Sequence, residues 1–409
     1  MKIKIYPSEL KGIINIPPSK SLTHRALICA SLCKGKSIII NPLYSDDTNN
    51  TISVLRALGV EIQVEETKII VISNGVLIPK EDLIIYESAS TLRFMIPIIS
   101  LFNNEFRIYS SAKLLERIKT KDLNSLSGLK FSITNNYVDV MGKLESNLIL
   151  SEDITSQWIS GILFTLPFTN SILNVIDYKN DYITLTIEMM KEFKAIVDYH
   201  DGKFISKNFF QASEVSIEGD LSNASFFLNM SVFNNLFIKN YNLESIQGDI
   251  RYLSFLNEMN YFPIMERSSL SIKNNITKSC TIDLFLNPDL AIPLACLASV
   301  SECIVKLTGL SKLKYKESDR IYATFDVLSK LGADISIDND CLIINGKSKL
   351  KGGVEVDSFN DHRIVMGLSS IASKIDLPFV INNYEAVNKS FPHFFEVFKS
   401  IGGKYDIEL

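Results

Sequence analysis

The hydrophobic pattern of the chain is repetitive. Three segments share one order: a short β-rich run, a polar turn that carries Asp, an amphipathic helix and a second short strand. They begin at Lys36, Asn235 and Cys303. Two of their helices end in Leu-Gly, at 58–59 and 331–332, where Gly can adopt the left-handed conformation that closes a helix. Because copies occur in both halves of the chain, the pattern predicts two domains built from one β-α-β unit.

A second set of segments is apolar on every face. These segments are 92–101, 158–166, 224–232, 290–300 and 364–371. Helices without a polar face are normally enclosed by other elements. The two patterns together favour an α/β fold in which buried helices lie inside a shell of sheets and outer helices.

Composition narrows the class of protein. A length of 409 residues favours two domains, and 42 Lys and Arg against 46 Asp and Glu leave a net charge of −4. This balance argues against a nucleic-acid or membrane partner. No apolar stretch reaches the ~20 residues of a membrane span, and the start has no signal-peptide core, so we expect a cytoplasmic protein. Six cysteines without CxxC spacing predict buried thiols, and four histidines make a histidine-built metal site improbable.

Small polar and basic residues precede the apolar helices. In Pro17-Pro18-Ser19-Lys20-Ser21, Ser19 is a candidate N-cap, and Ser21 and Arg25 lie four apart on one helix face. Unpaired N–H groups at a helix start favour an anion there. The same pattern recurs at 87–93, 155–157, 316–320, 360–363 and 389–392. Neither GxxxxGK[ST] nor GxGxxG is present, so the anion is not expected on a nucleotide-binding loop. Arg can grip a carboxylate or phosphate with two hydrogen bonds and Lys supplies a point charge, so a cleft with both suits small molecules that bear several such groups.

Three separated motifs, PPSKSLTHRAL, KESDRI and FNDHR, together with EGDLSNASFFL at Glu218 and QGDIR at Gln247, carry a resemblance. The chain resembles the 5-enolpyruvylshikimate-3-phosphate synthases of the enolpyruvyl transferase family from end to end. The resemblance implies transfer of the enolpyruvyl group of phosphoenolpyruvate to the 5-hydroxyl of shikimate 3-phosphate, with release of phosphate, in aromatic amino acid biosynthesis. It implies a two-domain inside-out α/β barrel, with three β-α-β-α-β-β units per domain. The domains would be 1–18 with 219–409, and 19–218, with the active site between them.

The resemblance also assigns site residues. Those expected to bind shikimate 3-phosphate are Lys20, Ser21, Arg25, Thr155, Ser156, Gln157, Lys179, Tyr182, Asp289, Lys312 and Lys316. Those expected to bind phosphoenolpyruvate are Lys20, Ala89, Arg93, Lys113, Gln157, Arg320, Arg363 and Lys389. The reaction adds a proton to a methylene carbon and removes one from a hydroxyl, so it needs two acid/base groups. Asp289, Glu317 and Lys20 are the candidates, and no metal or organic cofactor is expected.

Four positions depart from the family pattern. Ala89 stands where the family commonly has Gly, so a methyl group next to the phosphoenolpyruvate pocket predicts reduced sensitivity to glyphosate. Lys113 replaces an Arg and loses a two-pronged grip on a carboxylate. Lys179 and Lys312 replace a Ser and an Asn, which would bring two further cations towards the 3-phosphate.

Several alternatives stay open at this point. The acceptor could be UDP-N-acetylglucosamine, although Ser21 follows Lys20 and the loop SSAKLLER has no Cys, unlike that branch. The chain could also be a non-catalytic anion-binding relative. Asp289 could be only a helix cap, and His362 could act directly or through a neighbour. Caps are the favoured interpretation of Asp46, Asp47, Asp249 and Asp319. We expect a monomer whose domains close on the ligands, with hinges near 17–19 and 218–220.

Overall fold

The computed structural model describes residues 1–118, 121–150, 154–169, 171–175, 180–266, 268–273 and 275–408. The chain divides into two compact units: unit 1 is Met1–Pro17 with Gly219–Leu409, and unit 2 is Pro18–Glu218. The chain passes from one unit to the other at 17–18 and again at 218–219. Next to these points, the Ser19 N–H donates to the Glu218 carbonyl at 2.9 Å within unit 2. The Asp220 N–H donates to the Pro17 carbonyl at 2.8 Å within unit 1. A main-chain hydrogen bond therefore joins the segments of each unit where the chain enters and leaves.

Unit 2 repeats one β-α-β-α-β-β pattern. Its helices are α1 (Lys20–Leu32), α2 (Asp46–Ala57), α3 (Ala89–Phe102), α4 (Ala112–Ile118), α5 (Ser156–Leu163), α6 (Asp181–Glu192) and the 3₁₀ turns η1 (Lys121–Ser125) and η2 (Leu166–Phe168). Its strands are β3 (Lys34–Ile40), β4 (Glu61–Val64), β5 (Lys68–Asn74), β6 (Leu83–Ile84), β7 (Glu105–Tyr109), β8 (Leu129–Ile133), β9 (Tyr137–Gly142), β10 (Asn147–Leu150), β11 (Ile172–Val175), β12 (Val197–His200), β13 (Lys203–Ser206) and β14 (Glu214–Ser216).

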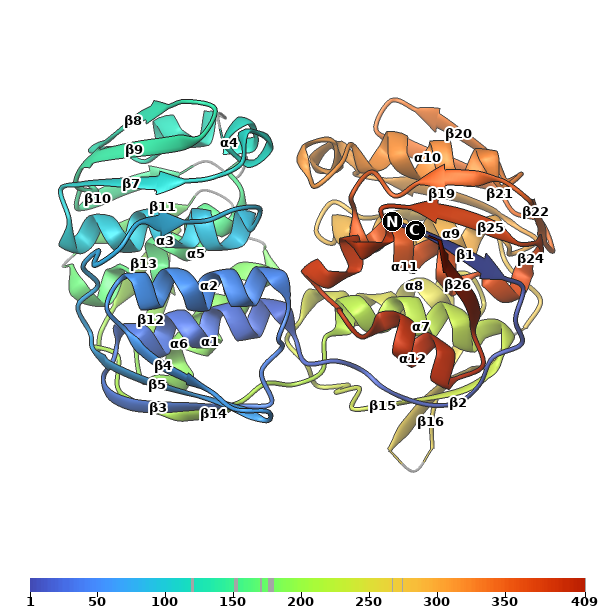
Figure 1. Cartoon of the computed structure of the whole chain (residues 1–409), viewed down its shortest axis with the longest axis horizontal. Helices are drawn as coiled ribbons and strands as arrows, with labels where there is room; N and C mark the ends of the chain where they lie inside the picture. The colour runs from blue at the N-terminus through green and yellow to red at the C-terminus, as the bar shows by residue number, and fades with distance from the viewer. Residues whose placement is uncertain are drawn as a thin grey trace. The chain divides into compact units, whose positions relative to one another are not determined.

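The described strands of unit 2 form three four-stranded sheets, in the orders β14-β3-β5-β4, β6-β7-β9-β8 and β10-β11-β13-β12. Each sheet begins with a parallel pair and continues with antiparallel pairs. The parallel pair needs a crossover helix, whereas the antiparallel pairs need only short turns. Figure 1 shows helices of this unit between the sheet of β7, β8 and β9 and the sheet of β3, β4, β5 and β14.

Unit 1 follows the same plan. Its helices are α7 (Leu221–Phe233), α8 (Tyr252–Glu258), α9 (Ala291–Ser299), α10 (Arg320–Lys330), α11 (His362–Ser370), α12 (Phe394–Ser400) and the 3₁₀ turns η3 (Gly248–Arg251), η4 (Pro288–Leu290), η5 (Ser311–Tyr315), η6 (Ala372–Lys374) and η7 (Tyr384–Lys389). Its strands are β1 (Lys2–Tyr6), β2 (Lys11–Asn15), β15 (Asn235–Lys239), β16 (Phe262–Glu266), β17 (Ser269–Lys273), β18 (Cys280–Asp283), β19 (Ile304–Thr308), β20 (Asp334–Asp338), β21 (Cys341–Asn345), β22 (Leu350–Gly352), β23 (Glu355–Asp357), β24 (Ile375–Leu377), β25 (Phe379–Asn382) and β26 (Lys404–Glu408).

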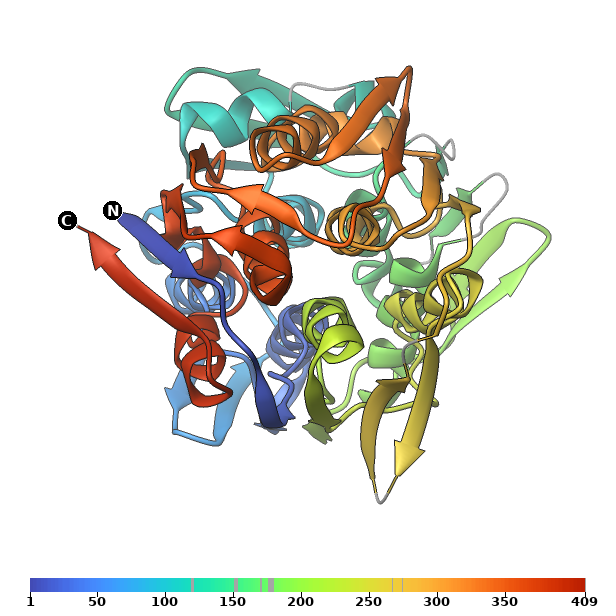
Figure 2. The same cartoon turned by 90° about the vertical axis from the view of Figure 1, so that its right-hand side faces the viewer.

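Among the described strands of unit 1, the four-stranded sheets have the orders β16-β17-β15-β2, β18-β19-β21-β20 and β23-β25-β1-β26, and β22 pairs with β24. The N-terminal strand β1 lies between β25 and β26, so both ends of the chain complete one sheet. In Figure 2, strands of this unit surround helices that are seen nearly end-on. Each pair among α7, α9 and α11 is in contact, and every residue of α9 and α11 is buried.

Close helix packing depends on small residues at two points. A Cβ atom on Gly161 of α5 would lie 2.7 Å from the Arg93 carbonyl oxygen of α3. A Cβ atom on Gly367 of α11 would lie 2.9 Å from the Cys296 Sγ of α9. Both distances are shorter than ordinary carbon contacts, so glycine lets these helix pairs approach. The first contact sets the separation of the two helices that carry Arg93 and Gln157.

The predicted α/β fold of repeated units around buried helices is confirmed. The apolar segments coincide with α3, α5, α7, α9 and α11, although α3 begins at Ala89, because the helix includes the polar turn that caps it. Of the cysteines, four are buried as predicted, whereas Cys280 and Cys341, the first residues of β18 and β21, are only half-buried. Within the described residues, no helix is long and apolar enough to cross a membrane.

Candidate active site

Polar N-cap residues precede four helices of unit 2. The side chains of Ser19, Ser88, Thr155 and Asn180 accept hydrogen bonds from main-chain N–H groups in the first turns of α1, α3, α5 and α6. A cap satisfies N–H groups that have no partner within the helix. The N-cap predicted at Ser19 is confirmed, and α3 and α5 begin within the expected polar segments 87–93 and 155–157. The residues that follow these caps carry most of the predicted site of this unit.

Arg25 ties three of these helices together. Its Nε donates to Thr186 Oγ1 at 2.8 Å, its Nη1 to the Ser21 carbonyl at 2.9 Å and its Nη2 to the Tyr182 carbonyl at 3.0 Å. Thr186 Oγ1 lies 2.7 Å from Ser160 Oγ of α5. Burial lowers the pKa of Arg25 to about 10, which still leaves it charged at neutral pH. The starts of α1, α5 and α6 are therefore adjacent, and a fixed cation lies among them.

Arg93 joins α3 to α5. Its Nη1 donates to Gln157 Oε1 at 2.7 Å, and Gln157 Nε2 donates to Ser90 Oγ at 2.8 Å. Its Nη2 donates to the Arg117 carbonyl at 3.2 Å. Arg93 is 7% exposed. Gln157 accepts from one predicted ligand-binding residue and donates to the first turn of the neighbouring helix, so it fixes the orientation of both.

The remaining predicted residues of unit 2 differ in exposure. Lys20 forms a 2.9 Å ion pair with Asp47 in the first turn of α2, and Ala89 is 8% exposed at the first position of α3. Lys113 is exposed on α4. Ser21, Ser156 and Tyr182 are half-buried at the starts of α1, α5 and α6. Lys179 lies outside the described residues, so its expected place near the 3-phosphate stays a prediction.

A buried guanidinium organises the predicted residues of unit 1. Arg320 is 2% exposed, and its Nε, Nη1 and Nη2 each lie 2.7 Å from a different carboxylate. The partners are Asp361, Asp289 and Glu317. Although burial lowers the pKa of Arg320, these three carboxylates more than reverse the effect and raise it. The guanidinium of arginine has five N–H donors in a rigid plane, so it can bind three acceptors at once in a fixed geometry, which a lysine ammonium cannot.

Asp289 receives further cations. Its Oδ1 lies 3.2 Å from Lys316 Nζ, and its Oδ2 lies 3.8 Å from Arg363 Nη2. Burial acts to raise the pKa of Asp289, but Lys316, Arg363 and Arg320 outweigh it and hold that pKa well below its ordinary value. Asp289 lies inside η4, whose N-cap is Asn287, and its carboxylate pairs with Lys316, Arg320 and Arg363, so the alternative that it is only a cap is wrong. The carboxylate is ionised at neutral pH and only 14% exposed.

The remaining predicted site residues of unit 1 are Arg363, Lys312 and Lys389. Arg363 Nη1 donates to the Asp289 carbonyl at 3.0 Å, and its main-chain N–H donates to Asp361 Oδ1, the N-cap of α11, at 3.0 Å. Lys312 Nζ lies over the Phe285 ring, 4.3 Å from its centroid, and Lys389 is buried at the end of η7. The structure thus brings Asp289, Lys316, Glu317, Arg320 and Arg363 into one contact network.

The expectation of helix caps holds at only one of four aspartates. Asp319 caps α10, with its carboxylate accepting from the Tyr322 N–H. Asp46 and Asp47 lie inside the first turn of α2, whose cap is Ser45. Asp249 lies in η3 and is 5% exposed. Asp361 binds Arg320 but was not among the predicted site residues. The sequence signal that could have indicated it is an acidic residue directly before two basic residues at a helix start.

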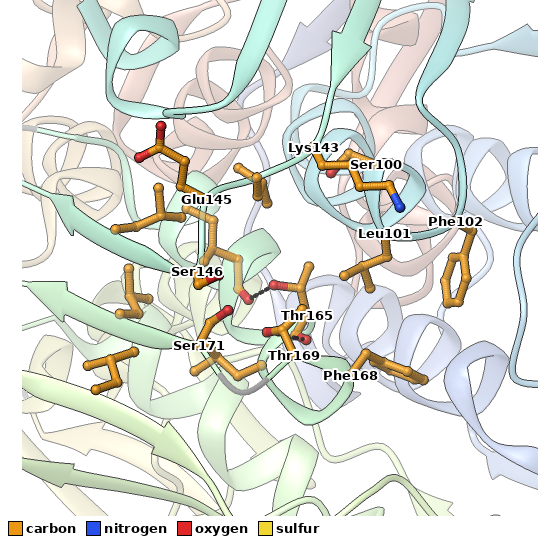
Figure 3. Close-up of a pocket in the computed structure, with 16 residues that line it drawn as sticks. Ser100, Leu101, Phe102, Lys143, Glu145, Ser146, Thr165, Phe168, Thr169 and Ser171 are labelled. Carbon is orange, nitrogen blue, oxygen red and sulfur yellow. Dashed lines mark hydrogen bonds between the residues drawn. The ribbon is translucent and has the colours of Figure 1, made fainter.

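A separate cavity lies at the opposite end of α3 from Ala89. Its volume is about 310 Å³, and its lining includes Ser100, Leu101 and Phe102 at the end of that helix, with Thr165 and Phe168. Figure 3 shows these side chains with Lys143 and Glu145. An α-helix rises about 1.5 Å per residue, so the cavity lies about 15–20 Å from the N-terminal end of α3, measured along that helix. None of the predicted site residues lines it.

Comparisons with known proteins now identify the family. The chain matches the family described as EPSP synthase (3-phosphoshikimate 1-carboxyvinyltransferase) over residues 5–398. The chain belongs to the EPSP synthase family. A relative named 3-phosphoshikimate 1-carboxyvinyltransferase from Clostridium novyi (strain NT) is 37% identical, covering 99% of this chain and 98% of the relative. One of the same name from Clostridioides difficile (strain 630) is 36% identical over the same shares.

Solved structures support the fold of this family member. An EPSP synthase from Acinetobacter baumannii superimposes with a TM-score of 0.80 at 22% identity, covering 99% of this chain and 100% of the other. The enolpyruvyl transferase NikO from Streptomyces tendae gives 0.78 at 13% identity, covering 99% and 98%. At these identities the likeness establishes the fold. The recognition of the family from its three motifs is confirmed by the full-length relatives.

His24 gives a pH-dependent prediction about the α1–α3 packing. Its Nδ1 lies 2.8 Å from Thr51 Oγ1, which lies 2.7 Å from Thr91 Oγ1. Burial, with Lys20 and Arg25, lowers the pKa of His24 to about 3, although Asp47 opposes the shift. Below the ordinary histidine pKa of about 6.5, the unfolded chain therefore binds a proton that the folded chain does not. The free energy of unfolding consequently decreases as the pH is lowered.

The His24→Asn variant should lose this pH dependence, because its amide can still bond Thr51 but does not titrate. Urea unfolding measures the free energy of unfolding at pH 7 and at pH 5. The decrease between the two pH values should be about 2 kcal/mol smaller in the variant than in the parent. His393→Asn is the control, since His393 is exposed beside Glu396. Equal pH dependence in the parent and His24→Asn proteins would contradict the burial argument.

Proposed function

We propose that this protein transfers the enolpyruvyl group of phosphoenolpyruvate to the 5-hydroxyl of shikimate 3-phosphate and releases phosphate. Membership of the EPSP synthase family supports the reaction, and the full-length relatives carry the corresponding name. The observation that carries the proposal at the level of residues is the network around Asp289, where Arg320, Arg363 and Lys316 surround one ionised carboxylate. Such fixed cations suit a reaction in which a phosphate leaves.

The proposed division of ligand binding follows the two units. In unit 2, the starts of α1, α5 and α6 around Arg25 would hold the 3-phosphate and ring of the acceptor. Arg93, Gln157 and Lys20 would bridge to phosphoenolpyruvate. In unit 1, Arg320, Arg363 and Lys389 would hold the carboxylate and phosphate of phosphoenolpyruvate. This proposed division requires the two units to close on both ligands, with the expected hinges near 17–19 and 218–220, where the main chain crosses between the units.

Acid and base roles can be ranked on electrostatic grounds. Because Lys316, Arg363 and Arg320 keep the pKa of Asp289 low, its carboxylate is a good hydrogen-bond acceptor but a weak base in the absence of ligands. It would orient the 5-hydroxyl and receive its proton only as bond formation makes that hydroxyl acidic. Glu317, bound to Arg320 and 20% exposed, is the proposed partner for the methylene carbon, together with Lys20. No cofactor takes part in these steps.

The choice of acceptor provides the test. Phosphate release should occur with phosphoenolpyruvate plus shikimate 3-phosphate and should be absent with UDP-N-acetylglucosamine. Mass spectrometry should identify the enolpyruvyl ether, and omission of either substrate is the control. Turnover with the nucleotide sugar would overturn the assignment in favour of the other branch. Calorimetric binding of shikimate 3-phosphate without product would favour the non-catalytic relative.

Ala89 predicts weakened inhibition by glyphosate. The residue is buried at the first position of α3, four residues before Arg93, so its methyl group reduces the space beside the proposed phosphoenolpyruvate site. Glyphosate is bulkier there than the substrate. The Ala89→Gly variant should have an inhibition constant at least about 5-fold lower than the parent, as expected for relief of an overpacking cost of about 1–3 kcal/mol. Steady-state inhibition against phosphoenolpyruvate measures both constants; equal values would contradict the steric explanation.

The cytoplasmic location and the monomeric state stay predictions from the sequence. The substrates phosphoenolpyruvate and shikimate 3-phosphate are the proposed small-molecule partners.

A further inference from the structure

A chain of buried polar side chains joins three helices of unit 2 and has no role in the proposed reaction so far. His24 Nδ1 of α1 lies 2.8 Å from Thr51 Oγ1 of α2, and Thr51 Oγ1 lies 2.7 Å from Thr91 Oγ1 of α3. Thr91 Oγ1 in turn lies 2.7 Å from the Oγ of Ser88, the N-cap of α3. None of these four residues, here called the His24 chain, is more than 2% exposed.

The polar groups of the His24 chain restrict how the three helices pack. Burying a hydroxyl costs free energy unless it is hydrogen-bonded, and apolar side chains of similar shape would fill the same positions at no such cost. A threonine or serine hydroxyl can accept from one neighbour and donate to the next, so the bonds form a continuous series. Hydrogen bonds require a narrow range of distance and direction, and a connected buried network therefore favours one arrangement of the helices.

The His24 chain lies one helical turn from the ion pair of Lys20. Lys20 and His24 are four residues apart on α1 and therefore lie on one face of that helix. Asp47 and Thr51 are likewise four residues apart on α2. Two successive contacts thus join α1 to α2: the 2.9 Å ion pair at the helix starts and the buried histidine–threonine bond one turn further along. The inner contact fixes the register of the two helices, and the position of the Lys20 ammonium depends on that register.

The other end of the His24 chain holds the first turn of α3, which begins with Ala89 and Ser90. The Oγ of Ser88 accepts a hydrogen bond from the Thr91 N–H at 3.4 Å, so the cap of α3 and the His24 chain share one hydroxyl. From α5, Gln157 Nε2 donates to Ser90 Oγ at 2.8 Å. Side chains of two neighbouring helices, α2 and α5, therefore hold this turn.

We infer that Thr51 and Thr91 are positioning residues for phosphoenolpyruvate. Their buried hydrogen bonds hold α1 and the first turn of α3 in the arrangement in which Lys20, Ala89 and Arg93 meet the anionic donor substrate. The inference rests on the proposed function, because it takes these three residues as part of the phosphoenolpyruvate site. Neither threonine touches a reacting atom in this account.

The acceptor side of unit 2 has a hydrogen-bond network of its own, which provides a comparison. Arg25 Nε donates to Thr186 Oγ1 at 2.8 Å, and Thr186 Oγ1 lies 2.7 Å from Ser160 Oγ. This network joins α1 to α5 and α6, where shikimate 3-phosphate is proposed to bind, and Thr186 is fully buried like Thr51. Removing one threonine hydroxyl from either network should therefore weaken the binding of a different substrate.

The test compares Thr51→Val, Thr91→Val and Thr186→Val. Valine keeps the branched shape and the helix propensity of threonine but lacks the hydroxyl. Thr51→Val and Thr91→Val should each raise the KM for phosphoenolpyruvate at least about 5-fold, because a buried hydrogen-bond partner is left unsatisfied. The calorimetric dissociation constant of shikimate 3-phosphate alone should stay within about twofold in both. Thr186→Val should show the reverse pattern.

Two further variants separate positioning from a general loss of packing. Thr91→Ser keeps the hydroxyl and should restore most of the affinity for phosphoenolpyruvate. In the Thr51→Val/Thr91→Val double variant, the increase in KM should be smaller than the product of the two single increases, because each single variant already breaks the bond between the two threonines.

Ser53→Ala is the matched control, since Ser53 is an exposed serine on α2 whose hydroxyl donates to the Asn49 carbonyl of the same helix at 3.0 Å. It should leave the binding of both substrates unchanged. Thermal unfolding should verify that every variant is folded at the assay temperature, and Thr51→Val tests the same bond if Thr91→Val does not fold.

Equal losses of affinity for both substrates in Thr51→Val and Thr91→Val, or fully multiplicative effects in the double variant, would overturn the positioning role. If the parent protein itself gives no product with shikimate 3-phosphate, the proposed function fails instead, so the two failures are distinguishable.

Discussion

The ion-pair network of Arg320 is the interaction on which the candidate site of unit 1 depends. One guanidinium, 2% exposed, satisfies three carboxylates that come from η4, from the turn before α10 and from the cap of α11. Without a cation, the buried Asp361 and the half-buried Asp289 and Glu317 would repel one another and would have lost part of their hydration. With Arg320 in place, they instead fix the relative positions of three helix starts. The positions of Lys316 and Arg363 follow from that arrangement.

Both units solve the same electrostatic problem in different ways. A basic residue near a helix N-terminus opposes the helix dipole and needs an acceptor. In unit 1 the acceptors of Arg320 are carboxylates, and Lys316 and Arg363 add two further cations around one of them, Asp289. In unit 2 Arg25 and Arg93 bond neutral carbonyl, hydroxyl and amide oxygens instead. Arg25 thus keeps more of its charge for an anionic ligand, which fits an acceptor substrate that carries a phosphate.

Much of this arrangement could be predicted from the sequence, and the part that could not has a physical reason. The apolar segments located the buried helices, and the polar segments before them, with Ser19 as the predicted N-cap of the first, located their starts, because both signals are local. The partner of Arg320 could not be predicted, since Asp361 lies 41 residues away and the contact depends on tertiary packing. The same limit explains Asp249: its turn position indicated a cap, but the folded chain buries it inside η3 at 5% exposure.

The ionisation of Asp289 tests this account most directly. Carbon-13 NMR of protein labelled at the aspartate carboxyl carbon, with the Asp289 signal assigned through Asp289→Asn, would follow this group as the pH is lowered. The account predicts that Asp289 stays ionised well below the usual aspartate range of about 3.9, to the lowest pH at which the protein is folded, while exposed aspartates titrate normally. Titration of Asp289 at or above that ordinary value would contradict the central role assigned to Arg320, Arg363 and Lys316.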